Sequence, residues 1–140
     1  MPEKYRLLGC PCIPIDSIDV AHELLVDLVN KGSFAYSVAI NAEKIMLYSS
    51  DTKLHEAIEQ SAFPFFDGAG AVLAMGWLHG RKTIKLDLPK TVLNLANVNK
   101  WRLFVLGSRE EVNRAACESI MRLYPDIQIA GRINGFESEE

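Results

Sequence analysis

A single carboxylate stands where an apolar run meets a turn that contains glycine. Asp67 follows Phe65 and Phe66, and it precedes Gly68, Gly70 and a wholly apolar segment. Partial burial between apolar segments would raise the pKa of this carboxyl group toward the range of a general base. The two glycines permit backbone conformations closed to other residues and the close approach of a ligand. The alternative is structural: the carboxylate caps the helix that follows, and the glycines shape a turn.

Two further polar turns follow apolar runs in the same way. The amide of Asn41 could orient a sugar or nucleotide hydroxyl, because it both donates and accepts hydrogen bonds. It could equally be the N-cap of a helix. Gly107 and Ser108 could cradle a phosphate or a uracil edge at a helix N-terminus. Their alternative is a capping box, in which Ser108 and Glu111 satisfy each other's backbone amides.

The elements around these turns alternate between strands and helices, which is typical of an α/β sheet covered by helices. Strands are expected at Tyr5–Leu8 and Cys12–Ile15, forming a hairpin around Gly9-Cys10-Pro11, and then at Phe34–Ile40, Ala62–Phe66, Trp101–Leu106 and Ile127–Ala130. Helices are expected at Ile18–Asn30 with Ser17 as its cap, after Asn41, after Asp51 as a cap, at Ala71–Leu78, from Pro89 and after Ser108. Ala71–Leu78 is apolar all round and should be buried on most sides. Ligands of open α/β sheets bind beyond the carboxyl ends of strands, so these turns predict a binding rim.

The composition predicts one domain over residues 1–140, with 49% hydrophobic and 24% charged residues. A formal net charge of -3 disfavours nucleic acid as a partner. The sequence has no apolar run long enough to span a bilayer and no signal-peptide pattern, so a cytoplasmic protein is expected. Cys10, Cys12 and Cys117 are expected as reduced structural thiols.

Several catalytic fingerprints are absent from the sequence. It contains no G-x-G-x-x-G and no P-loop, which weighs against hydride transfer and ATP hydrolysis. It also contains no G-x-S-x-G, no H-E-x-x-H and no Asp-x-Asp pair, so no cofactor and no metal site are predicted. If the ligand is a nucleotide sugar, the charge of its leaving group must be met by amide dipoles and by Lys or Arg.

Four segments taken in order resemble the WecG/TagA/CpsF glycosyltransferase family: "SVAINAEKIM", "FFDGAGAV", "RLFVLGS" and "LYPDIQIAGRINGF". The resemblance implies a Rossmann-like α/β fold with a parallel-type sheet flanked by helices. It also implies an inverting, metal-independent transfer of an N-acetylmannosamine-type sugar from UDP to N-acetylglucosamine linked to polyprenyl diphosphate, in bacterial surface polysaccharide synthesis. The form "AINAEK" is most similar to the branch that transfers N-acetyl-D-mannosaminuronic acid, because the teichoic-acid branch usually has Thr in place of Ala39.

The resemblance also implies roles for the residues of the first two turns. Asp67 matches the family's proposed base, which takes the proton of the acceptor hydroxyl as that oxygen attacks the anomeric carbon. Asn41 matches an asparagine of the family's pocket. Gly68 and Gly70 would then let the sugar nucleotide come close to the backbone.

The resemblance assigns the remaining matched residues to the binding of the nucleotide and its diphosphate. Gly107, Ser108 and Gly135 match the regions that the family places near the nucleotide, and so does Phe136, which stands in place of the usual Tyr. Lys85 stands where the family has an Arg. It would hold the diphosphate as a point charge, without the planar fork of a guanidinium.

The sequence ends after "NGFESEE", where family members continue with a helix, a further strand and a basic appendage that reaches the membrane. Peripheral contact with the inner face of the membrane is therefore expected only if that segment is supplied. A missing strand would leave a sheet edge unpaired, which favours a homo-oligomer. The alternative function is a truncated, non-catalytic UDP-binding or interaction module of the same family.

Overall fold

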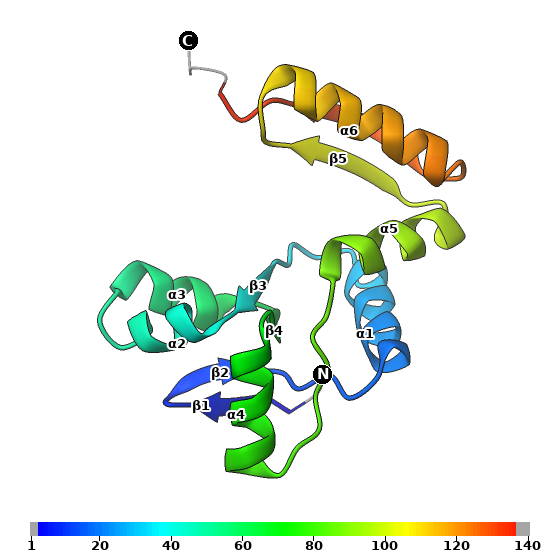
Figure 1. The fold of residues 1–140 in the computed structure, drawn as a ribbon. Helices are drawn as coiled ribbons and strands as arrows, with labels where there is room; N and C mark the ends of the chain where they lie inside the picture. The colour runs from blue at the N-terminus through cyan, green and yellow to red at the C-terminus, as the bar shows by residue number, and fades with distance from the viewer. Residues whose placement is uncertain (1–2, 137–140) are drawn as a thin grey trace. The chain divides into compact units, whose positions relative to one another are not determined.

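The structure is a computed structural model in which residues 3–136 are described (Figure 1). It divides into two compact units, of which the first ends at Asp87 and the second begins at Leu88. Both units combine helices with a parallel pair of strands, and the first also contains an antiparallel N-terminal hairpin. The predicted α/β class is therefore confirmed. The single domain expected over residues 1–140 stays a prediction.

The strands of the first unit form two pairs, and a backbone bridge made by Ile13 links one pair to the other. The hairpin pairs β1 with β2, and β3 runs parallel to β4 with Ile40 opposite Phe66. Ile13 forms a parallel bridge to Phe65, and its backbone N–H donates to the carbonyl of Pro64 at 2.8 Å. The hairpin is thus tied to the edge of β4. The bounds are β1 Tyr5–Leu7, β2 Cys10–Cys12, β3 Ser37–Ile40 and β4 Phe63–Phe66.

The helices of the first unit begin where the sequence offers caps. The side chain of Ser17 accepts from the amide of Val20 at 3.3 Å, and that of Asp51 accepts from the amide of Leu54 at 3.0 Å. Both predicted caps are confirmed. The helices are α1 Ile18–Asn30, α2 Ala42–Leu47, α3 Thr52–Gln60 and α4 Ala69–His79.

The core of the first unit gathers side chains from the hairpin, β3, β4 and the three helices α2 to α4. Its buried members are Leu7, Cys10, Cys12, Ile40, Ile45, Tyr48, Ile58, Phe66, Ala71 and Met75. Cys10 and Cys12 are free thiols, as predicted, and burial raises their pKa to about 11 and about 12 respectively. Phe66 belongs to this core and directly precedes Asp67, so the turn that carries the carboxylate is anchored to it.

The hairpin differs from the prediction in its turn. Leu8 and Gly9 form the turn, with φ of +48° and +88°, and the second strand begins at Cys10. The hairpin is confirmed, but its turn lies at Leu8 and Gly9 rather than at Gly9-Cys10-Pro11, and the strand expected at Cys12–Ile15 shares only Cys12 with β2. Pro11 lies inside β2, opposite Arg6.

The expected burial of α4 is also wrong. Ala71 and Met75 are buried, whereas Leu73, Leu78 and Trp77 are exposed, Trp77 to 87%. The stripe of α4 that contains Ala71 and Met75 packs on the core. Because the helix is apolar on every side, its sequence carries no polar face that would mark the exposed side.

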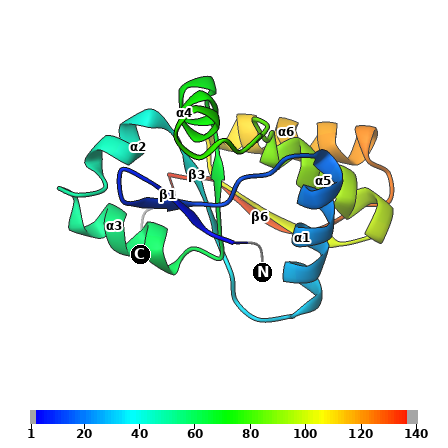
Figure 2. The ribbon, with the colours of Figure 1, turned by 90° about the horizontal axis from the view of Figure 1, so that it is seen from below.

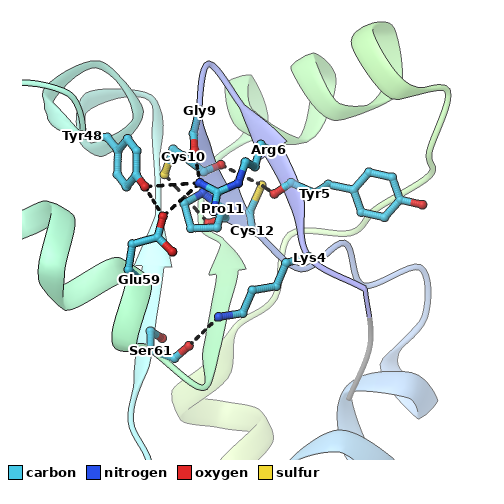
Figure 3. Close-up of polar contacts among 10 residues, drawn as sticks. All are labelled: Lys4, Tyr5, Arg6, Gly9, Cys10, Pro11, Cys12, Tyr48, Glu59 and Ser61. Atoms are coloured by element: carbon cyan, nitrogen blue, oxygen red, sulfur yellow. Dashed lines mark hydrogen bonds and ion pairs between the residues drawn. The ribbon is translucent and has the colours of Figure 1, made fainter.

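A polar cluster holds the hairpin to α2 and α3 (Figure 3). Arg6 Nη1 donates to the carbonyl of Gly9 at 2.7 Å and to Oε1 of Glu59 at 2.9 Å. The hydroxyl of Tyr48 donates to the same carboxylate. These two hydrogen bonds, first from Tyr48 and then from Arg6, lower the pKa of Glu59.

We expect the Glu59→Gln variant to lose stability in a pH-dependent way. A carboxyl group whose pKa is lower in the folded state stabilises the fold above its unfolded pKa, and the effect is lost as pH falls through the folded value. The gap in free energy of unfolding between wild type and Glu59→Gln should therefore be widest near neutral pH and narrow below the ordinary Glu pKa of 4.5. Urea unfolding at a series of pH values measures it, with Glu56→Gln as a control for charge loss on the same helix. A gap that does not change with pH would contradict the prediction.

The second unit pairs β5 with β6 in parallel and places α6 along the pair in both views (Figure 2). Gly131 of β6 faces Phe104 of β5, and an added Cβ there would come within 2.7 Å of the ring. The strand expected at Ile127–Ala130 extends further along the chain. The bounds are α5 Leu88–Asn99, β5 Arg102–Leu106, α6 Glu110–Leu123 and β6 Gln128–Ile133. None of the helices described within residues 3–136 has the length and hydropathy that crossing a membrane requires.

Candidate functional site

Asp67 and Asn41 lie at neighbouring strand ends in the first unit. The backbone N–H of Asp67 donates to the carbonyl of Ile40 at 2.9 Å, just beyond the last paired residues of β3 and β4. Each polar residue is therefore the first one past its own strand, as the sequence predicted. The side chain of Asp67 is 49% exposed, so the carboxylate is partly covered and still open to solvent.

The carboxylate of Asp67 is not the cap of α4. The N-cap position falls on Gly68, which has φ of +138° and no side chain to cap with. The alternative reading of Asp67 as a helix cap is therefore wrong. A backbone with this φ favours glycine, and this accounts for Gly68.

The space above this turn is open. A Cβ added at Gly68 or Gly70 would meet no heavy atom within 4 Å. Gly70 has no positive φ, and so neither backbone strain nor packing calls for glycine at that position. The turn thus presents open backbone beside a solvent-exposed carboxylate.

Lys85 supplies a positive charge next to Asp67. Its Nζ lies 4.0 Å from Oδ1 of Asp67, and both side chains are largely exposed, so the ion pair adds little to stability. The segment before it is irregular. It is held by the amide of Ile84, which donates to the carbonyl of Ile15 at 2.7 Å, and by the hydroxyl of Thr83.

Asn41 is the N-cap of α2, so the capping interpretation is confirmed for this residue. Its Oδ1 accepts from the amide of Lys44 at 2.9 Å, and the ammonium group of Lys44 donates to the carbonyl of Ala39 at 2.8 Å. The capping hydrogen bond uses the oxygen of the side-chain amide of Asn41. The NH2 group of the same side chain is the part that could donate to a ligand.

In the second unit, the predicted capping box at the start of α6 is wrong. The N-cap is Arg109, which makes no side-chain capping hydrogen bond, and the helix begins at Glu110. Ser108 has φ of +62°, whereas an N-cap residue requires an extended backbone. Gly107, with φ of +119°, completes a turn of two left-handed residues after β5.

The structure brings Gly107, Ser108 and Gly135 together. The amide of Gly135 donates to the carbonyl of Ser108 at 2.7 Å. A Cβ on Gly135 would lie 3.1 Å from the nitrogen of Ser108 and 3.2 Å from the Cα of Gly107, so only glycine fits this contact without displacing backbone. Phe136 follows with an exposed ring.

Asn113 is a residue of this region that the sequence analysis missed. It lies on α6, four residues before Cys117, and these are the buried residues of that helix. The amide of Asn113 donates to carbonyls at the ends of both β5 and β6. A polar residue in register with a buried stripe was the signal that could have found it.

Comparison with known proteins places these residues in a family. Residues 5–140 match the glycosyl transferase WecG/TagA/CpsF family. The chain is 28% identical over 100 residues to N-acetylglucosaminyldiphosphoundecaprenol N-acetyl-beta-D-mannosaminyltransferase of Bacillus subtilis (strain 168), which covers 69% of this chain and 39% of that protein. The protein of the same name from Staphylococcus aureus (strain MRSA252) is 29% identical over 98 residues, covering 68% of this chain and 39% of its own length.

The chain thus spans about two fifths of the length of these curated relatives. The family match extends through both compact units, from the hairpin onward. It includes the turn at Asp67 and the turn at Gly107 and Ser108. This chain belongs to the WecG/TagA/CpsF family of glycosyl transferases.

Proposed function

We propose that this chain is the base-bearing part of a glycosyltransferase that moves an N-acetylmannosamine-type sugar from UDP to N-acetylglucosamine linked through diphosphate to a polyprenol. The family match and the names of the two relatives support the reaction class and the substrates. The observation that carries the proposal is the placement of Asp67. Its carboxylate is exposed at the carboxyl end of β4, beside Asn41 and an open glycine turn.

In this mechanism Asp67 acts as a general base. Its carboxylate takes the proton of the acceptor hydroxyl while that oxygen forms a bond to the anomeric carbon of the sugar. The bond from the anomeric carbon to the diphosphate oxygen breaks, and its electron pair leaves with UDP. Because the nucleophile replaces the leaving group directly from the opposite side, the transfer inverts the anomeric centre.

The neighbours of Asp67 have supporting roles. Lys85, whose Nζ lies 4.0 Å from Asp67, would offset the negative charge that develops on the leaving diphosphate. The NH2 group of Asn41 donates to a hydroxyl or acyl oxygen of the sugar. The open backbone at Gly68 and Gly70 admits the sugar nucleotide. No step in this scheme requires a metal ion.

We assign the turn of Gly107, Ser108 and Gly135 to the nucleotide. The turn lies between the carboxyl end of β5 and the start of α6, and the first amides of a helix have no partner within the helix, so they suit an anion. The exposed ring of Phe136 offers a flat apolar surface for a base. The polyprenyl chain of the acceptor lies in a bilayer, so the proposed reaction takes place at a membrane surface.

Two measurements on the full chain test the proposal. Calorimetry measures the binding of UDP, and a radiolabel assay measures transfer from a UDP-N-acetylmannosamine-type donor to a lipid-linked N-acetylglucosamine. Binding together with transfer is the expected result. Binding without transfer would favour the non-catalytic UDP-binding module, and the absence of both would contradict the proposed function.

A further inference from the structure

Asn113 is a buried amide that contacts the ends of both strands of the second unit. Its side chain is on α6, and the residue is 2% exposed. Nδ2 donates to the carbonyl of Gly107 at 2.9 Å and to that of Ile133 at 3.1 Å, and it lies 3.5 Å from the carbonyl of Val105. One NH2 group therefore serves the carbonyls just where β5 and β6 end.

The oxygen of the side-chain amide of Asn113 is held by a second residue, Arg132. Oδ1 of Asn113 accepts from Nη1 of Arg132 at 3.4 Å. Arg132 is itself fixed by a two-pronged contact with Glu110, at 2.9 Å and 2.6 Å. The hydrogen bond from Arg132 determines which way the side-chain amide of Asn113 faces, because only Oδ1 can accept from the guanidinium.

The amide of Asn113 thereby sets the shape of the turn that follows β5. The carbonyl of Gly107 accepts from Asn113 on α6, and the backbone amide of Gly107 donates to the carbonyl of Ile133 at 3.0 Å. The next carbonyl, that of Ser108, faces the amide of Gly135. Ser108 is held in the left-handed region, a conformation that a serine keeps only when its surroundings determine it.

We propose that Asn113 is a positioning residue for the sugar donor: it fixes the turn of Gly107 and Ser108 in the form that binds a nucleoside diphosphate. This inference rests on the proposed function. Asn113 itself is buried and does not touch the ligand. Its removal takes the side-chain donor from the carbonyl of Gly107 and one of two donors from the carbonyl of Ile133, which lets the turn relax.

The test compares two asparagines of the second unit at opposite ends of the strand pair. Asn113→Ala removes the amide at the carboxyl ends. Asn97→Ala is the matched control, because Oδ1 of Asn97 accepts from the amide of Asp126 at 3.0 Å, just before β6 begins. Calorimetry with UDP on the folded full chain should show a Kd raised at least about tenfold for Asn113→Ala. The control should stay within about twofold of wild type.

Two further readouts separate positioning from a general loss of stability. The KM for the sugar donor should rise by a larger factor than kcat falls, because a misplaced turn weakens binding of the donor. In ¹⁵N spectra of the folded variant, the amides of Gly107 and Gly135 should shift, whereas those around Asp126 should not. Arg132→Met provides a second variant should Asn113→Ala fail to fold, and it should raise the Kd in the same direction by a smaller factor.

The outcomes distinguish this proposal from the function on which it rests. If the wild-type chain binds UDP and the folded variant binds it within about twofold, the role of Asn113 is overturned and the proposed function stands. If the wild-type chain binds no UDP, the proposed function itself fails, and the role of Asn113 fails with it.

Discussion

Asp67→Asn is expected to lower the rate of sugar transfer by at least about a hundredfold while the fold stays intact. The amide has the shape of the carboxylate but cannot take the proton of the acceptor hydroxyl. The side chain is 49% exposed and its ion pair with Lys85 is weak, so the substitution removes little that holds the protein together. The measurement is kcat in the radiolabel assay, together with the free energy of unfolding in urea.

A control variant makes this result specific to Asp67. Asp19→Asn removes an exposed carboxylate from the first turn of α1 in the same unit, and its rate should stay within about twofold of wild type. An Asp67→Asn enzyme that keeps the wild-type rate would remove the base from the proposed mechanism. Loss of both rate and stability would instead assign Asp67 a structural role.

Phe66→Ala is expected to lower the free energy of unfolding by about 3–5 kcal/mol. Phe66 is 1% exposed and packs in the core that joins the hairpin to α2, α3 and α4. Removing its ring takes away buried apolar surface and leaves a cavity that the surrounding backbone can fill only in part. Urea unfolding of the full chain, followed by circular dichroism, gives the value.

The first unit also offers a control for Phe66. Phe34 is 92% exposed, so Phe34→Ala should change the free energy of unfolding by no more than about 0.5 kcal/mol. Equal effects at the two positions would contradict the assignment of Phe66 to the core. Because Asp67 follows Phe66 directly, the variant should also lose transfer activity if it remains folded.

The sequence predicted best those features that depend on neighbouring residues. The caps at Ser17 and Asp51 need only a side-chain oxygen and an amide three residues away, and both form as expected. The strand that ends at Phe66 follows from an apolar run bounded by a glycine turn. In each case the signal and the contact lie within a few residues of each other.

Features that depend on distant contacts were predicted less well. The strand expected from Phe34 begins at Ser37, because an apolar run does not show how much of it a neighbouring strand will pair. The sequence predicts Pro11 in the hairpin turn, yet it lies within β2. The uniform apolarity of α4 indicated burial but could not tell which face meets the core.

The same difference holds within the candidate site: residues placed by local sequence were predicted, and residues placed by distant contacts were not. The placement of Asn41 and Asp67 past parallel strands follows from the ends of those strands and from the parallel pairing, and the sequence indicated both. The capping box at Ser108 failed because the turn is determined by Gly135 and Asn113, which lie far along the chain or on the next helix. The buried register of α6 could have singled out Asn113, but it could not have shown the carbonyls of the two strands that Asn113 contacts.

The exposed ring of Trp77 has a practical consequence for spectroscopy. The sequence contains two tryptophans, and Trp77 is 87% exposed in the folded chain. Its emission already comes from an environment of water, so unfolding should change the emission of Trp77 little, and a fluorescence change on denaturation should come mainly from the partly buried Trp101. The indole of Trp77 would respond strongly to any molecule that covers α4, and it is therefore a natural optical reporter of contacts made by that helix.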